Sequence, residues 1–216
     1  EALALPKLLA HPGDTVLVPA PSYPLFELLG RINDVTLVHY PLAQADGFGI
    51  DLEALDRAAK AASPRALLIV SPGNPTGTFL KRREMEALDE ICARSGIPII
   101  CDEVFGDYAL REDPDRVRTL AGREGVLTFV LNGLSKMLAL PQLKLGWVGL
   151  TGPAALRAEA MARLELVADS YLSVNTPVQR ALPQLLALGR RLQAQLRERV
   201  AHNRAALVAA RPGDAA

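Results

Sequence analysis

Apolar and polar positions alternate along this chain with two different periods. Short runs rich in β-branched residues, typical of strands buried on both faces, recur between longer stretches with an amphipathic helical repeat. The strand pattern covers 15–19, 35–40, 66–71, 97–103, 126–132 and 145–150. The helical pattern covers 1–10, 24–32, 51–62, 80–95, 152–168, 176–188 and 190–210. Apolar strands that alternate with helices predict an α/β fold: a mostly parallel sheet between two layers of helices.

Two of the predicted helices carry clear end signals. Asp51 is a good N-cap for the helix that follows it, although a full capping box is missing. Ser95-Gly96 closes the next helix before the apolar run that begins at Ile97. These signals support the division of the chain into alternating strands and helices.

The pattern changes around Gly189 to a long basic helix. Leu192, Leu196 and Val200 recur there at a helical spacing, which is typical of a solvated helix with one buried stripe. We therefore expect a large domain over 1–189 and a helix over 190–216 that leads toward a further, small domain. Both ends of the chain look cut, so we expect it to be a piece of a longer protein.

The composition is that of an ordinary globular protein. Of 216 residues, 50% are apolar and 22% are charged, and the formal net charge is zero. This balance gives no electrostatic footprint for nucleic acid or an anionic membrane, and no apolar run approaches the roughly 20 residues that span a bilayer. Cys92 and Cys101 lack a CxxC or Cys/His spacing, so the sequence predicts no disulfide framework and no metal site. A cytoplasmic location fits best.

Residues able to do chemistry follow four of the predicted strands. The segments are "APSYP" (20–24), "SPGNPTG" (71–77), "CDEVF" (101–105) and "GLSK" (133–136). Ligands of open α/β sheets bind beyond the carboxyl ends of the strands. We therefore expect one aromatic ring, one amide, one carboxylate and one lysine to converge on the same rim.

These segments, with "PQLKLGW" following the last of them, resemble the class I/II aminotransferases, the pyridoxal-phosphate enzymes of fold type I. The motifs run in this order from Pro21 to Trp147. Any one of them is a weak signal, but four in register are specific. The resemblance implies pyridoxal 5′-phosphate as cofactor, an amino acid and a 2-oxo acid as substrates, and a homodimer.

Lys136 and Asp102 are the catalytic residues that the resemblance implies. Lys136 would form the Schiff base with the cofactor aldehyde and then carry a proton, for which its amine must be neutral. Asp102 ends an apolar run, where a lone carboxylate is costly unless it has a cationic partner. The protonated ring nitrogen of the cofactor would be that partner. Glu103 points to the opposite side of the strand by alternation.

Three further residues would contact the cofactor. Tyr23 would stack on its ring, burying a large apolar area. Asn74, held in a turn between glycine and proline, would donate to the ring oxygen. Ser135, with the main chain of Gly133, would form one side of the phosphate site.

The sequence departs from the family at three positions. Lys144 stands where an arginine usually grips the phosphate, so it keeps the charge but loses the bidentate fork. Gly133 replaces a frequent hydroxyl residue, and Phe105 replaces a tyrosine that contacts the ring oxygen. Tyr108 in the next turn is the nearest replacement hydroxyl, although we do not assign it that role.

Parts of the family's site are expected outside this sequence. The first phosphate-binding loop and its edge strand would precede Glu1, and the helix at 1–10 would offer its N-terminus to the phosphate. The arginine that binds the substrate carboxylate would lie in the small domain beyond 216. The segment 171–179 matches a loop that approaches the cofactor of the partner subunit.

Two other functions use the same fold and stay open. A β-lyase or decarboxylase would need the same lysine and aspartate, and a non-enzymatic regulator would bind the cofactor next to a DNA-binding domain. A dinucleotide-dependent dehydrogenase lacks its GxGxxG after the first strand. A serine hydrolase lacks its GxSxG elbow, and His11, His39 and His202 lie far from any such motif.

Overall fold

The computed structural model describes residues 4–210, which form two compact units. The sheet unit takes in 4–103, 115–132 and 146–173, and the helical unit takes in 104–114, 133–145 and 174–210. The outer parts of the first and last predicted helices, 1–3 and 211–216, lie outside the described residues, as does the helix N-terminus expected to meet the phosphate.

The strands and helices follow the predicted alternation. The strands are β1 (Thr15–Ala20), β2 (Thr36–Ala43), β3 (Gly49–Ile50), β4 (Ala66–Val70), β5 (Ile99–Asp102), β6 (Thr128–Gly133) and β7 (Gly146–Thr151). The helices are α1 (Ala4–Leu9), α2 (Leu25–Ile32), α3 (Leu52–Ala62), α4 (Arg82–Ser95), α5 (Leu134–Met137), α6 (Ala154–Ala168) and α7 (Thr176–Ala210), with 3-10 turns η1 (Gln44–Asp46), η2 (Gly106–Tyr108) and η3 (Pro141–Leu143). Every predicted strand is present. The sequence missed β3 and α5, which are too short to show a period.

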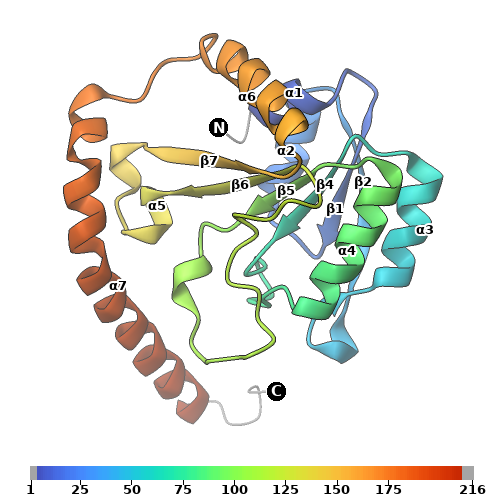
Figure 1. The fold of residues 1–216 in the computed structure, drawn as a ribbon. Coiled ribbons are helices and arrows are strands. Elements are labelled where there is room, and N and C mark those ends of the chain that lie inside the picture. Colours follow the sequence, from blue (N-terminus) through green and yellow to red (C-terminus); the bar gives the residue numbers. More distant parts are fainter. Residues whose placement is uncertain (1–3, 211–216) are drawn as a thin grey trace. The chain divides into compact units, whose positions relative to one another are not determined.

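The sheet of the sheet unit has seven strands in the order β3-β2-β1-β4-β5-β6-β7 (Figure 1). β1 pairs in parallel with β2 and β4, and β5 pairs in parallel with β4 and β6. Only the short β3 is antiparallel among the pairs whose register is defined, against β2. The strand order reverses direction between β1 and β4, which is a topological switch point.

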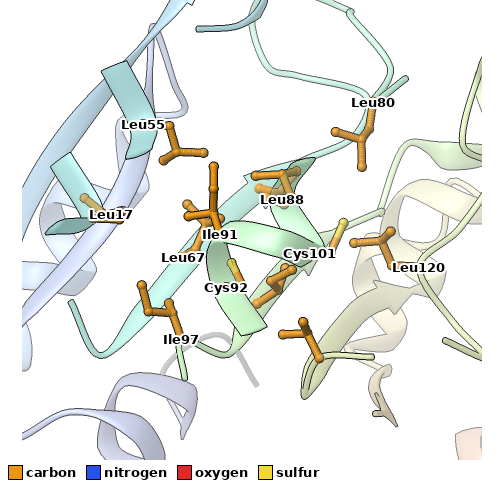
Figure 2. Close-up of a cluster of buried hydrophobic side chains, with 14 of the residues drawn as sticks. Leu17, Leu55, Leu67, Leu80, Leu88, Ile91, Cys92, Ile97, Cys101 and Leu120 are labelled. Carbon is orange, nitrogen blue, oxygen red and sulfur yellow. The ribbon is translucent and has the colours of Figure 1, made fainter. Parts of the chain in front are cut away.

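Strand alternation divides the apolar side chains between two faces. Leu17 and Leu67 face α3 and α4, whose Leu55 and Leu88 are almost fully buried against them (Figure 2). Ile99 belongs to the same cluster. Helices α3 and α4 also pack on each other on this face (Figure 1). Burying each of these leucines stabilises the fold by about 1.5–3 kcal/mol.

The neighbouring strand positions form the second cluster, on the other face. Val16, Leu68 and Ile100 belong to it, together with Phe129 of β6 and Ala160 of α6. Helices α1 and α2 add partly buried side chains, and α1 packs against α6. The sheet unit therefore has the predicted three layers, with the sheet between α3 and α4 on one side and α1, α2 and α6 on the other.

The two predicted helix ends are confirmed. The carboxylate of Asp51 accepts a hydrogen bond from the amide of Ala54 at 2.9 Å, which satisfies one of the free donors at the start of α3. Gly96 ends α4 with a φ of 65°, in the left-handed region that glycine adopts without strain.

In the helical unit the prediction of two separate helices is wrong, because α7 runs through Gly189 without a break. Gly189 is buried, and a Cβ there would lie under 3.0 Å from the Leu138 side chain. This glycine does not end the helix; its missing side chain lets Leu138 approach the backbone of α7 closely. The predicted stripe is also shorter than expected, since Val200 is exposed whereas Leu192 and Leu196 are half-buried. No helix within 4–210 combines the length and apolarity needed to cross a membrane.

Candidate active site

The predicted site residues of the sheet unit lie at the carboxyl ends of three neighbouring strands. Tyr23 follows β1, Asn74 follows β4, and Asp102 is the last residue of β5. The β4–β5 ladder places Val70 opposite Asp102, so both strands end at the same level. These residues therefore surround the switch point between β1 and β4, where ligands of open α/β sheets bind.

A cavity of about 30 Å³ opens at this switch point. Its lining includes Pro21 and Ser22 after β1, Val70 at the end of β4, and Asn74 in the loop that follows. The hydroxyl oxygen of Ser22 is buried and finds no hydrogen-bond partner among the described residues. Such a hydroxyl is costly to leave unpaired. The cavity has room only for water-sized groups.

The loop that carries Asn74 is tightly folded on itself. The amide of Gly73 donates to the Thr78 carbonyl at 2.9 Å, and the amide of Gly77 donates to the Gly73 carbonyl at 2.8 Å. A Cβ on Gly73 would lie under 3.0 Å from the hydroxyl oxygen of Thr76, so the threonine occupies the space of the missing side chain. Asn74 is thus half-buried in a loop with little freedom to move.

Two buried side chains, Ser71 before this loop and Glu84 in α4, hold the segment between the loop and α4 in place. The hydroxyl of Ser71 accepts a hydrogen bond from the amide of Leu80 at 3.1 Å. The carboxylate of Glu84 accepts from the amide of Lys81 at 2.7 Å and from the amide of Ile50 in β3 at 2.8 Å. The short β3, which the sequence missed, therefore helps to hold the candidate site in place.

Tyr23 presents an exposed ring at the rim of the sheet unit. Its side chain is 45% exposed, and its ring meets that of Phe26 edge to face at 6.1 Å between centroids. Phe26 is half-buried in the second apolar cluster, so it fixes the position of the tyrosine ring from one side. A face of Tyr23 is therefore available for a planar ligand.

The two acidic neighbours at the end of β5 have different surroundings. Asp102 is half-buried, and its main-chain carbonyl accepts from the amide of Ser71 at 3.0 Å. Glu103 is buried, and its carboxylate accepts from the amide of Leu120 at 2.7 Å. Burial raises the pKa of Glu103 above its ordinary value. Glu103 therefore anchors the segment that leads to β6.

In the helical unit, Lys136 lies on the single turn α5. Leu134 and Leu138 take the buried positions of this turn, while Lys136 faces outward and is exposed. Its ammonium nitrogen lies 5.9 Å from the centroid of the Phe105 ring, within the range of a cation–π contact. In the apolar run around the lysine, it is therefore the leucines that are buried, whereas the amine of Lys136 is accessible.

Lys144 ends η3 with its side chain exposed and a φ of 51°, a left-handed conformation that few residues other than glycine adopt. Its neighbour Leu145 is buried and accepts from the amide of Leu134 at 2.9 Å. This hydrogen bond joins the Lys144 segment to α5, where Ser135 is half-buried. The helical unit therefore contains Ser135, Lys136 and Lys144. The sheet unit contains Tyr23, Asn74 and Asp102.

Tyr108 has a role that the sequence does not reveal. Its hydroxyl lies 3.0 Å from the carbonyl oxygen of Lys136 and 2.8 Å from that of Met137. A hydroxyl that donates to these carbonyls does not replace the one missing from Phe105. The unpaired hydroxyl of Ser22 was also missed, although it lies within the "PSYP" motif, because burial of a single atom leaves no mark in a sequence.

The sequence profile of the family "Aminotransferase class I and II" matches residues 2–210. This chain belongs to the class I and II aminotransferase family. Nicotianamine aminotransferase 1 of Oryza sativa subsp. japonica is 30% identical over 183 residues, covering 83% of this chain and 36% of that relative. Glutamate-pyruvate aminotransferase AlaA of Escherichia coli K12 is 30% identical over 178 residues, covering 82% of this chain and 44% of that relative. The chain thus spans less than half the length of these curated relatives.

Solved aminotransferase structures share the fold. N-succinyldiaminopimelate aminotransferase from Mycobacterium tuberculosis aligns with a TM-score of 0.83 and 30% identity, over 96% of this chain and 53% of that one. Alanine aminotransferase from Pyrococcus furiosus aligns with a TM-score of 0.79 and 26% identity, over 92% and 51%. The chain therefore has the fold of the type I pyridoxal-phosphate enzymes, as predicted. Members of this family use pyridoxal phosphate.

Proposed function

We propose that the whole protein is a pyridoxal-phosphate-dependent transaminase that moves an amino group between an amino acid and a 2-oxo acid. One observation carries this proposal: a carboxylate ends one parallel strand, and a lysine follows the end of the neighbouring parallel strand. Asp102 ends β5 and pairs in the ladder with Leu131 of β6, and α5 with Lys136 follows β6 directly. The aminotransferase names of the relatives support the same reaction.

The side chains at the strand ends fit the chemistry of the cofactor. Tyr23 offers an exposed aromatic face, Asn74 offers an amide at the switch point, and Asp102 offers a carboxylate for a cationic ring nitrogen. Lys144 and Ser135 offer an ammonium and a hydroxyl for a phosphate. The unpaired hydroxyl of Ser22 leaves one further polar group without a protein partner. When bound, the cofactor would supply a reactive aldehyde and an electron sink.

In this proposal Lys136 and Asp102 have separate tasks. The amine of Lys136 holds the cofactor covalently and, once released and neutral, moves a proton at the α-carbon of the substrate. Its outward position on α5 leaves it free to reach such a ligand. Asp102 stabilises positive charge on the ring nitrogen, which strengthens the electron sink. Lys144 contributes a single point charge where an arginine would give a fork.

We also propose a cytoplasmic homodimer in which the segment 171–179 approaches the partner's cofactor. Two exposed apolar side chains in this segment support a contact with another protein surface, since Leu172 is 101% exposed and Tyr171 is 41% exposed. Analytical ultracentrifugation of the intact protein should give twice the monomer mass. A monomer at micromolar concentration would contradict this assembly.

The covalent role of Lys136 is tested by borohydride reduction of the intact, cofactor-loaded protein, followed by peptide mass spectrometry. We expect the cofactor on the peptide that contains Lys136, and no labelled peptide from Lys136→Ala. Lys60→Ala is the control, because it removes an exposed lysine of α3 that has no role in the candidate site and should leave the label in place. Asp102→Asn should bind cofactor but lose most proton abstraction. A label on any other lysine, or near-normal turnover of Asp102→Asn, would refute the assignment.

A further inference from the structure

Helix α5 is too short to hold its own shape. It comprises Leu134–Met137, and a single helical turn is not stable in isolation. The Leu134 carbonyl accepts from the amides of Leu138 at 3.1 Å and Leu140 at 3.2 Å, but the carbonyls at the end of the helix have poorer partners within it. Within the turn, the Lys136 carbonyl accepts a long hydrogen bond, 3.4 Å, from the amide of Ala139 and a contact from the amide of Leu138, only two residues away. Carbonyls at a helix end need partners from elsewhere.

Tyr108 of η2 supplies such a partner to both of the last carbonyls. Its hydroxyl lies 3.0 Å from the Lys136 oxygen and 2.8 Å from the Met137 oxygen, so its single proton is shared between the main-chain oxygens of the lysine and of the next residue. Burial, and then the nearby Asp107, raise the pKa of Tyr108, so the hydroxyl keeps its proton at neutral pH.

Helix α7 contacts the same turn at two points. The side-chain amide of Gln193 donates to the Met137 carbonyl at 3.3 Å. Gly189 allows the α7 backbone to approach Leu138 so closely that a Cβ would overlap its side chain. Arg197 donates to the Asp107 carbonyl at 3.0 Å, which joins α7 to η2. Three segments far apart in the sequence thus hold one another within the helical unit.

We propose that Tyr108 is a positioning residue for Lys136: its hydroxyl, supported by Gln193, holds the carbonyl end of α5 and so aims the lysine amine. This inference rests on the proposed function only in giving Lys136 its task. A reactive group that is misplaced by an ångström loses a large part of its rate. Fixing the main chain of the lysine is therefore a direct way to preserve that rate.

The first test needs no cofactor. In the cofactor-free intact protein, Tyr108→Phe keeps the ring and removes the hydroxyl. We expect amide hydrogen exchange of Leu138 and Leu140 to accelerate about fivefold, as for the loss of one hydrogen bond. Tyr40→Phe is the matched control, because the Tyr40 hydroxyl makes a similar hydrogen bond, 2.8 Å to the Leu68 carbonyl, inside the sheet unit. That variant should leave both exchange rates unchanged.

The second test uses the loaded enzyme. Tyr108→Phe should lower kcat about fivefold or more with KM nearly constant, because the substrate is still bound but the amine is less well aimed. Unchanged exchange at Leu138 and Leu140 would overturn the positioning role, as would faster exchange with a normal kcat. If the parent protein shows no transamination, the proposed function fails, and the exchange measurement alone decides whether Tyr108 holds the turn.

Discussion

Gly73→Ala tests how strictly the loop around Asn74 is packed. The added methyl group would lie under 3.0 Å from the hydroxyl oxygen of Thr76, whereas ordinary contacts begin at 3.4 Å. Gly73 is also joined to the opposite side of its loop, as donor to Thr78 at 2.9 Å and as acceptor from Gly77 at 2.8 Å. The loop therefore cannot open without losing hydrogen bonds.

The expected cost follows from that overlap. Inserting a methyl group into a packed site costs about 1–3 kcal/mol of unfolding free energy. The lower end applies if the Thr76 side chain rotates away, because its hydroxyl accepts only a weak hydrogen bond, 3.4 Å long, from the amide of Thr78. Thr76→Ala alone should therefore cost about 0.5 kcal/mol.

The assay is a double-mutant cycle measured by urea unfolding of the intact protein. With alanine at 76 the new methyl group would meet the Cβ of that residue and the Thr78 carbonyl oxygen, each at an ordinary 3.7 Å, so Gly73→Ala should cost little in the Thr76→Ala background. Thr76→Val is the matched control, since it keeps a group of the same size in the contact and should leave the cost in place.

Two results would refute this reasoning. Additive effects of Gly73→Ala and Thr76→Ala would show that the loop relaxes elsewhere. If Thr76→Val lowered the cost of Gly73→Ala as much as Thr76→Ala does, the overlap with the Thr76 position would not be the cause of that cost. Cofactor affinity measured on the same variants should follow the stability changes, because Asn74 lies between the two substituted positions in the sequence.

Two other predictions concern charged groups. Glu103→Gln keeps an acceptor for Leu120 and removes the buried charge. Because burial raises the folded-state pKa of Glu103 above 4.5, its stabilising contribution is complete below pH 4.5 and is lost as the pH rises through the raised pKa. The Gln variant should therefore gain unfolding free energy relative to the parent as the pH rises from 4.5 to 8 in urea titrations, and a constant difference would contradict this. Lys144→Arg should lower the Kd for pyridoxal phosphate about five- to tenfold in a fluorescence titration, because it restores a bidentate fork. An unchanged or higher Kd would place the phosphate elsewhere.

The local chain pattern predicted the elements of the sheet unit well. Its strands are mostly apolar and its helices carry end signals such as Asp51 and Gly96. Residues close together in the chain are therefore enough to predict these elements. The same reasoning failed at Gly189, because a glycine that ends a helix and a glycine that admits a neighbouring side chain look alike in one sequence.

The sequence motifs suggested candidate site residues, but they did not indicate which distant residues support them. Tyr23 and Asn74 stand in loops that follow strands and Asp102 ends a strand, positions that motif spacing along the chain can indicate. That Lys136 belongs to the same site stays a prediction. Their supports come from distant segments: Glu84 reaches β3, and Gln193 reaches α5. No local pattern marks a contact between residues so far apart in the chain.

The sequence by itself determined the α/β class, the order of the strands and helices along the chain, and the family, because each depends on short-range periodicity or on motifs of a few residues. Only the tertiary structure decided that Lys136 is exposed while its leucine neighbours are buried, and that Tyr108 holds the main chain of the lysine. Both depend on which groups meet across the folded chain, and a linear pattern does not contain those contacts.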